Sequence, residues 1–436
     1  MHSIAMHIYF SGIGGTGVGP LALVAQQAGY AISGSDKQDS AYIEYLKKHG
    51  ISDVHIGQGY DEMQAVHNNN PIDWFVYTSA LPLENPDAPE LRFCAENNIK
   101  ISKRDELLNK IIADKNLKMI AIAGTHGKTT TTAMTVWAMK QLNIPISYIL
   151  PAKSSFAEMG EFNEKSEYFV YECDEFDRNF LNFNPFVSLI SGIDYDHPDI
   201  YPTVEEYNQA FIEFIGQSQQ TIMWHSDATK INQQPSPEIT ILENNLSRDT
   251  GLTLAGQVNR ENAYLVAKTL EKITKISFDE LVPVLNMFPG VSRRFERIIP
   301  NLYSDYAHTP PKIKGAIQLG HEVAGDNLVV VYEGLHNTRQ HFIKDELADL
   351  FNGVKQLYIV PSYLAREDES LKLLSPVDLK ALLNDSSQKV TVPSGLNSEL
   401  LQNIKQHLEK NDTVLCLTAG GGASLDEWLR KSFLVA

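Results

Sequence analysis

Residues 119–132 constrain the fold of this chain more than any other segment; they read Met-Ile-Ala-Ile-Ala-Gly-Thr-His-Gly-Lys-Thr-Thr-Thr-Thr. The first five residues are apolar and predict a buried strand, and Thr130 to Met139 predict a helix. A glycine-lined turn between a strand and a helix start bares backbone N–H groups where the helix dipole is positive. Such a turn suits a polyphosphate, so this segment predicts an α/β unit with a phosphate-binding loop.

The polar residues of this turn match a nucleoside triphosphate and its metal ion. Lys128 would place a charge at the β- and γ-phosphates, and the Thr129 hydroxyl would meet Mg²⁺. Ile122 stands where an ordinary phosphate loop has its first glycine, so the loop is a shortened form, G-x-x-G-K-T-T. The alternative is a glycine turn that only caps a βα unit. The predicted ATP-binding residues here are Gly124, Thr125, His126, Gly127, Lys128, Thr129 and Thr130.

A second glycine loop lies near the N-terminus, after a predicted strand at residues 6–10 and before a predicted helix at 20–28. A further strand at 31–36 ends in Asp36, which either contacts a ribose or caps the next turn. This order predicts a Rossmann-like βαβ opening with a pyrophosphate at the helix start. An NAD-dependent oxidoreductase would share this opening but would not explain Gly-Lys-Thr-Thr. The predicted substrate-binding residues are Gly12, Gly14, Gly15, Thr16, Gly17, Ser35, Asp36 and Ser79.

The chain has 436 residues, too many for one core, and strands alternate with helices along it. We predict an α/β protein of three domains. Residues 1–115 form a Rossmann-like domain, 116–296 a central doubly wound ATPase domain, and 297–436 a second Rossmann-like domain. The polar stretch at 225–255 predicts an exposed hairpin or loop.

Charge and cysteine content exclude several classes of function. Net charge is 37 − 54 = −17, which argues against nucleic-acid or anionic-membrane partners. Three scattered cysteines fit neither a disulfide framework nor a zinc cluster. No apolar run approaches the roughly 20 residues that cross a bilayer. We expect a cytoplasmic protein, a monomer or weak dimer.

Acidic residues and a histidine follow two predicted strands of the central domain, at 168–171 and 187–190. Thr129 and Glu172 are the first pair of predicted metal ligands, because Mg²⁺ prefers few protein ligands and hard oxygen donors. His197 is an unusual magnesium ligand, but its position at a strand end beside Asp196 predicts a metal or phosphate contact. The alternatives are a solvated turn carboxylate for Glu172 and an ordinary turn histidine for His197. Neighbouring carboxylates are expected to be supporting or solvated; they are Asp174, Glu175, Asp177, Asp194 and Asp199.

The chain resembles the Mur ligase family over essentially its whole length. The resemblance rests on six segments: Gly124-Thr-His-Gly-Lys-Thr-Thr130, Glu172-Cys-Asp-Glu175, Asp196-His197, Asn259-Arg-Glu-Asn262, Arg293-Arg-Phe-Glu296 and Asp305-Tyr-Ala-His308. It implies one domain each for a UDP-sugar, ATP and an incoming amino acid. It also implies a two-step reaction in which a carboxylate takes the γ-phosphate of ATP and an amine then displaces phosphate.

By this resemblance, further residues acquire roles. Lys128, Glu172, His197, His308 and Arg339 would be catalytic. Asn259 and Asn262 would face the adenine, and Arg294 and Asp305 would hold the ribose and phosphates. For His308 a structural hydrogen bond is an equal alternative, and Arg293 and Arg294 could be a basic surface pair.

Within the family, the resemblance favours the branch that joins L-alanine to UDP-N-acetylmuramate. Later family members carry a carbamoylated lysine where Phe211 stands. The muropeptide-recycling branch, which attaches a tripeptide to the same sugar, also lacks that lysine and is the nearest rival. Departures from the family pattern are Gly192, Val258, Thr309, Leu335 and His336. A non-catalytic nucleotide-binding relative is a third alternative.

Overall fold

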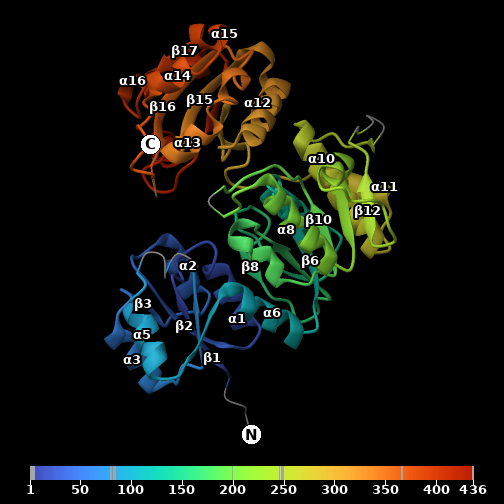
Figure 1. The fold of residues 1–436 in the computed structure, drawn as a ribbon, viewed down its shortest axis with the longest axis vertical. Coiled ribbons are helices and arrows are strands. Elements are labelled where there is room, and N and C mark those ends of the chain that lie inside the picture. Colours follow the sequence, from blue (N-terminus) through green and yellow to red (C-terminus); the bar gives the residue numbers. More distant parts are fainter. Residues whose placement is uncertain are drawn as a thin grey trace. The chain divides into compact units, whose positions relative to one another are not determined.

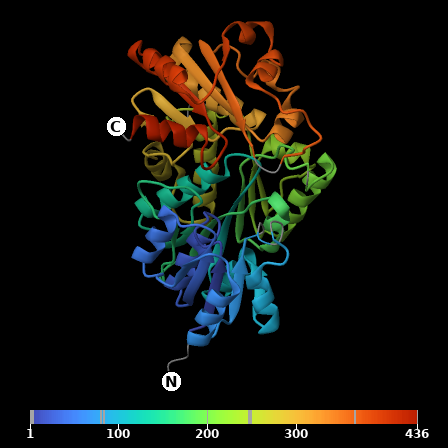
Figure 2. The same cartoon turned by 90° about the vertical axis from the view of Figure 1, so that its left-hand side faces the viewer.

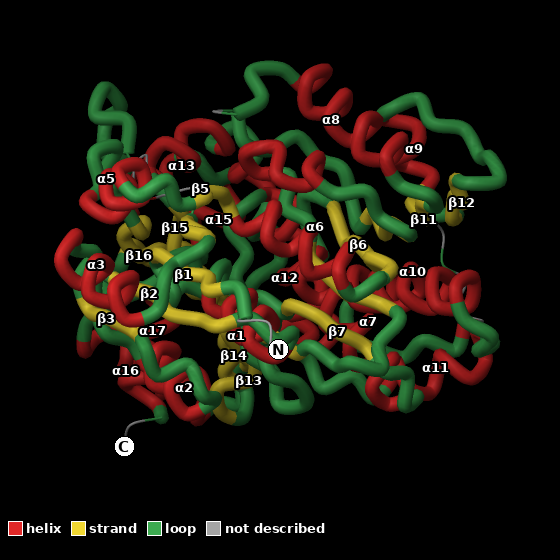
Figure 3. Tube along the Cα trace, turned by 90° about the horizontal axis from the view of Figure 1, so that it is seen from below, coloured by secondary structure: helices red, strands yellow, loops and turns green. Residues whose placement is uncertain are grey.

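The computed structural model of this chain contains three β-sheets interleaved with helices (Figures 1 and 3). It describes residues 5–78, 81, 85–198, 200–244, 246, 250–364 and 367–434. Ser79 and Asp199, two residues of the sequence predictions, lie outside the described residues.

The first sheet has five parallel strands in the order β3-β2-β1-β4-β5. Strand β1 is central and buried along its length, since it is paired on both edges. Ser11 pairs with Ser35 on one side and Tyr77 on the other, so three strands end at one edge. The strands are β1 His7–Ser11, β2 Ala31–Asp36, β3 Val54–Ile56, β4 Trp74–Tyr77 and β5 Lys100–Lys103. The helices are α1 Gly19–Gln27, α2 Ala41–Lys48, α3 Tyr60–Asn69, α5 Pro89–Glu96 and α6 Arg104–Asp114.

The second sheet has the order β12-β11-β10-β6-β9-β7-β8, and all its pairings are parallel except that of β8. Strand β6 lies between β10 and β9, which buries the apolar run predicted at 119–123. The strands are β6 Lys118–Ala123, β7 Ile146–Ile149, β8 Gly160–Glu161, β9 Tyr168–Glu172, β10 Val187–Ile190, β11 Thr221–Trp224 and β12 Ile239–Leu242. The helices are α7 Lys128–Gln141, α8 Val204–Gln217, α9 His225–Lys230, α10 Gln257–Ile273 and α11 Phe278–Asn286, with a 3-10 segment η1 at Phe176–Asn182.

The prediction of a hairpin or loop over 225–255 was wrong in part. Helix α9 occupies its first residues, and β12 joins the sheet edge parallel to β11. Strand β12 is only partly buried, so its sequence lacks the apolar run that marks the inner strands.

The third sheet has the order β13-β14-β18-β15-β16-β17, parallel except for β13. Its inner strands β15 and β18 are buried throughout, as their Val- and Leu-rich sequences predict. The strands are β13 Glu296–Ile299, β14 Leu302–Asp305, β15 Leu328–Leu335, β16 Gln356–Tyr363, β17 Thr391–Pro393 and β18 Thr413–Leu417. The helices are α12 Pro310–Ala324, α13 Asn337–Ile343, α14 Pro376–Ala381, α15 Asp385–Lys389, α16 Ser398–Glu409 and α17 Leu425–Phe433, and short 3-10 turns lie at Gly325–Asn327 and Leu347–Asp349.

The chain forms two compact units, 1–250 with 265–288 and 251–264 with 289–436. The first unit holds the first two sheets, whose strands run from blue to yellow-green in Figure 2, and the second holds the third sheet. The predicted α/β fold class is confirmed, with three mainly parallel sheets. Cys94, Cys173 and Cys416 are buried free thiols. Among the helices of the described residues, none combines the length and the apolar character needed to cross a membrane.

Candidate functional site

The phosphate loop has the strand–turn–helix geometry that its sequence predicts. Strand β6 ends at Ala123 and helix α7 begins at Lys128, with Gly124 at φ +139° and Gly127 at φ +77°. A Cβ on Gly124 would lie 2.6 Å from Ser191 Oγ, so the loop packs too closely for a side chain there. The left-handed Gly127 turns the chain so that the first N–H groups of α7 are available to an anion.

Lys128 is held between its own loop and an acidic segment. Its Nζ donates to Gly124 O at 2.6 Å and to Glu175 Oε2 at 2.5 Å, and it lies 3.6 Å from Asp174 Oδ1. Burial favours the neutral amine, but the carboxylates of Glu175, Asp174 and Glu172 outweigh it and raise the pKa of Lys128. The ammonium therefore stays charged without a ligand.

Glu175 is only 1% exposed, so it is not one of the solvated carboxylates. Burial raises the pKa of Glu175, while Lys128 pulls it down. The pKa of each partner is raised, so both groups favour their protonated form, and we describe the pair as an ammonium and a carboxylate because a second carboxylate, Asp174, also contacts Lys128. Burial likewise opposes ionisation of Asp174, but Lys128 and Arg104 lower its pKa.

The predicted metal ligands lie at the same sheet edge. Glu172 ends β9 and pairs with Ile122 of β6, directly before the phosphate loop. The Nε2 atom of His197 lies 3.9 Å from Glu175 Oε1 and 3.8 Å from Asp196 Oδ2. Thr129 is buried in the first turn of α7, as is Thr130.

The described residues contain no group of three or more His, Cys, Asp or Glu side chains placed to hold a metal ion. A hydroxyl, a carboxylate and an imidazole at one edge nevertheless fit an ion that takes its other ligands from phosphate and water.

His126 is fixed by a network behind the loop. Its Nε2 lies 2.8 Å from Asp194 Oδ2, and Asp194 Oδ1 accepts from Lys230 at 2.8 Å. Although burial opposes it, these two partners lower the pKa of Asp194 to about 2. Gly192 makes room for this arrangement, because a Cβ there would overlap the His126 ring. Thr125 also bonds this segment, donating to the backbone oxygen of Asp194 at 2.7 Å.

The glycine loop of the first sheet is braced from β2. The backbone N–H of Gly14 donates to Asp36 Oδ2 at 2.8 Å, so Asp36 holds the loop itself. Ser35 is buried, and both its hydroxyl and that of Ser11 donate to Glu90, at 2.6 Å for Ser11. The other predicted loop residues, Gly12, Gly15, Thr16 and Gly17, lie between β1 and α1.

In the second unit, several predicted residues gather at the end of β14. Asp305 closes the strand and accepts from the Phe295 N–H at 2.8 Å. Burial raises the pKa of Asp305 to about 6, against the opposing effect of Arg294. The Arg294 guanidinium lies 5.4 Å from the Tyr306 ring, and the His308 ring lies 4.7 Å from the same ring.

The two residues predicted to face the adenine, Asn259 and Asn262, lie on the first turns of α10, which belong to this second unit. Asn259 is partly buried and its amide donates to Ala255 O at 2.9 Å, whereas Asn262 is buried.

The carboxyl end of β15 organises a neighbouring glycine loop. Glu333 accepts from the N–H of Ala419 at 3.0 Å and of Leu425 at 2.9 Å, so it fixes both ends of residues 419–425. Three residues after Glu333, His336 lies 3.4 Å from Glu367 and precedes helix α13, which carries Arg339.

Sequence reasoning missed Glu90 and Glu333, and it did not identify Glu175 as the buried partner of Lys128. Each is an acidic residue whose burial depends on partners at least 40 positions away. Glu333 alone carried a signal, since it continues the apolar run 328–332 directly.

Comparison with known proteins decides the family. A model described as "Mur ligase family, catalytic domain" matches residues 7–116, and "Mur ligase middle domain" matches 122–263. A UDP-N-acetylmuramate–L-alanine ligase of Clostridium beijerinckii is 30% identical, with 95% of each chain covered. The chain belongs to the Mur ligase family.

Solved structures share the fold of this Mur ligase. A UDP-N-acetylmuramate–alanine ligase of Thermotoga maritima has a TM-score of 0.71 at 22% identity, covering 98% of this chain and 97% of the other. A murein peptide ligase of Psychrobacter arcticus has a TM-score of 0.64 at 19% identity, covering 99% and 100%.

Phe211 of this Mur ligase is buried among other aromatic rings. Its ring lies 5.2 Å from both Phe180 and Tyr207, and all three belong to one core cluster. The Tyr207 hydroxyl lies 2.6 Å from Thr125 Oγ1, so the aromatic cluster supports the phosphate loop.

Proposed function

We propose that this Mur ligase joins L-alanine to the lactyl carboxylate of UDP-N-acetylmuramate at the expense of ATP. The observation that carries the proposal is the site around Lys128. A glycine loop, a buried ammonium and carboxylates lie at one sheet edge, in a chain that matches an alanine-adding ligase over its full length.

The residues of the loop would hold the triphosphate. The N–H groups at the start of α7 and the Lys128 ammonium offer positive charge to the β- and γ-phosphates. Thr129 and Glu172 would hold one Mg²⁺ and His197 a second, and these ions when bound supply charge neutralisation at the phosphates. Asn259, Asn262, Arg294 and Asp305 are proposed to bind the rest of the nucleotide.

The reaction has two balanced steps. An oxygen of the lactyl carboxylate forms a bond to the γ-phosphorus, the bond to the β-γ bridging oxygen breaks, and ADP leaves. The amine nitrogen of alanine then attacks the acyl carbon, the carbon–oxygen bond to phosphate breaks, and the nitrogen loses a proton. Lys128 stabilises charge in the first step, and His308 and Arg339 are proposed to act near the amine.

Phosphate release by the purified chain tests this function. We expect release only when ATP, Mg²⁺, UDP-N-acetylmuramate and L-alanine are all present. Release with glycine, or with the tripeptide that a recycling ligase uses, but not with alanine would contradict the alanine assignment. Binding of ATP and UDP-sugar with no release for any amine would indicate a non-catalytic relative.

A further inference from the structure

Arg104 lies over the first glycine loop. It begins helix α6, directly after strand β5, and its Nη1 is 3.5 Å from the Gly17 carbonyl oxygen. A Cβ on Gly17 would lie 2.5 Å from the same Nη1, so the guanidinium covers the last glycine of the loop. All these residues belong to the first compact unit.

The same guanidinium feels the acidic segment beside the phosphate loop. Tyr171, Asp174, Asp105 and Glu172 raise the pKa of Arg104, against the opposing effect of burial. Asp174 is also 3.6 Å from Lys128 Nζ. Glu172 and Asp174, at the end of β9, therefore act electrostatically on two cations: Lys128 of the phosphate loop and Arg104 at the start of α6.

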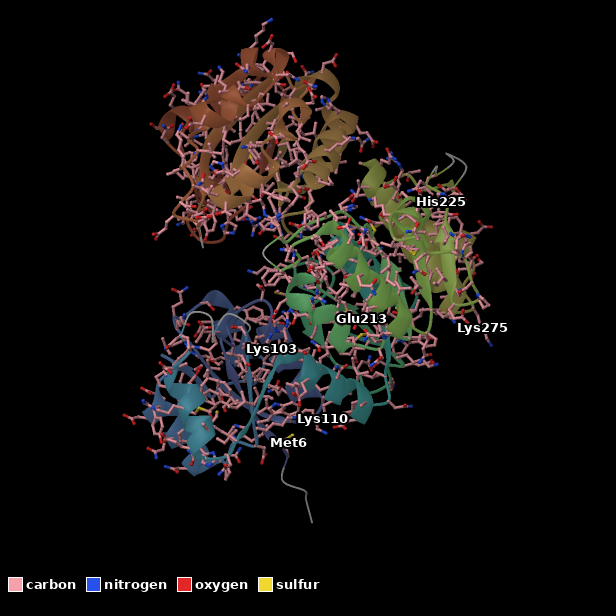
Figure 4. All side chains as sticks on the ribbon, in the orientation of Figure 1. Met6, Lys103, Lys110, Glu213, His225 and Lys275 are labelled. Atoms are coloured by element: carbon pink, nitrogen blue, oxygen red, sulfur yellow. The ribbon has the colours of Figure 1, made fainter. Side chains whose placement is uncertain are left out.

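The reaction requires a cation in this position. While the first glycine loop holds the pyrophosphate of the UDP-sugar, the lactyl carboxylate must approach the γ-phosphate, where Glu172, Asp174 and Glu175 already concentrate negative charge. A guanidinium can bind a carboxylate through two parallel hydrogen bonds, which also fixes its orientation. The neighbouring Lys103, labelled in Figure 4, is paired with Asp177 at 2.6 Å.

We propose that Arg104 binds the carboxylate of the acid substrate and directs it from the first glycine loop toward Lys128. This assignment rests on the proposed function. It adds a substrate-orienting residue that comes from the junction of the first two sheets.

Binding of two UDP-sugars, one with the lactyl carboxylate and one without it, distinguishes carboxylate binding by Arg104 from pyrophosphate binding or a structural role in the loop. UDP-N-acetylglucosamine has no lactyl ether and so no carboxylate. In calorimetry without ATP, we expect Arg104→Met to weaken UDP-N-acetylmuramate binding about 10- to 100-fold, the range of a charged bidentate contact. Binding of UDP-N-acetylglucosamine should change by less than about threefold. The affinity of Arg104→Lys for UDP-N-acetylmuramate should lie between those of the wild type and Arg104→Met. Lysine keeps the positive charge but cannot make the two parallel hydrogen bonds of a guanidinium.

Lys103→Met is the matched control, since it removes the adjacent cation, and it should leave both affinities unchanged. The thermal midpoint and the affinity for a non-hydrolysable ATP analogue check that Arg104→Met is folded. Equal weakening for both UDP-sugars would assign Arg104 to the pyrophosphate or to loop structure and overturn the proposal, as would no weakening. If the wild type itself fails to bind UDP-N-acetylmuramate, the proposed function falls with it, and that result differs from an insensitive variant.

Discussion

The ammonium of Lys128 lies 2.5 Å from the buried Glu175 carboxylate, and the two residues follow the carboxyl ends of the neighbouring parallel strands β6 and β9. This contact holds the lysine at the loop before a nucleotide arrives. It also means that removing either partner leaves a buried charge to be neutralised by protonation or by water.

Lys128→Met should abolish turnover, by about 1000-fold or more, because it removes charge stabilisation at the transferred phosphate. It should also lower the thermal midpoint at pH 8, since Glu175 remains buried without its partner. The double variant Lys128→Met/Glu175→Gln should recover most of that midpoint and none of the turnover. Lys140→Met, on the same helix and paired with the partly exposed Glu161, is the control and should cost less than about 1 kcal/mol. Retained turnover in Lys128→Met would remove the phosphate-loop assignment.

Gly192→Ala should displace the His126 ring, because the new methyl group would occupy its space. We expect overpacking to lower the free energy of unfolding by about 1–3 kcal/mol. The thermal midpoint should fall accordingly, and an ATP analogue should bind more weakly. Adding His126→Ala should recover part of the midpoint, since it removes the overlapping ring but not the backbone strain of a side chain at φ +159°. Gly216→Ala, where nothing lies within 4 Å of the new Cβ, is the matched control. An unchanged midpoint in Gly192→Ala would show that His126 adopts another position in solution.

Asp305→Asn should stabilise the protein at neutral pH. A carboxyl whose pKa is about 6 when folded and lower when unfolded adds stability below its unfolded pKa and loses it as pH rises through 6. The amide, which cannot ionise, should therefore be more stable by on the order of 1–3 kcal/mol at pH 8 and equal to the wild type near pH 4. Thermal midpoints from pH 4 to 8 measure this, with the exposed Asp326→Asn as control. A difference in thermal midpoint between Asp305→Asn and the wild type that stays constant from pH 4 to 8 would exclude titration of Asp305 as the cause.

Glu333→Gln should loosen residues 419–425, because an amide offers one oxygen acceptor where the carboxylate offers two. Hydrogen exchange should speed up at the Ala419 and Leu425 amides, read on peptides that span 413–430. Glu427→Gln is the control: Glu427 accepts from the N–H of Ala423 in the same loop, but its other oxygen pairs with Lys431 at 2.9 Å rather than with the loop. Equal exchange in both variants would assign no special role to Glu333.

Much of the fold was readable because its signals are local. The apolar runs at 119–123, 187–190 and 328–332 became the inner strands β6, β10 and β15, which are buried wherever neighbours pair on both sides. Strand β12 was missed because an edge strand needs no such run. The site residues predicted on the phosphate loop were likewise set by glycines at fixed spacing, since only such residues allow its positive φ angles.

The sequence by itself determined the α/β class, the glycine loop between β6 and α7 and the family, because periodicity and short motifs depend on neighbours along the chain. Only the tertiary structure decided which acid faces Lys128, that Asp36 braces Gly14, and that Arg104 covers Gly17. Those pairings join strand ends and helix starts that are distant in sequence. These residues are brought together because parallel strands end at the same edge of a sheet. No local sequence pattern encodes which strands are neighbours.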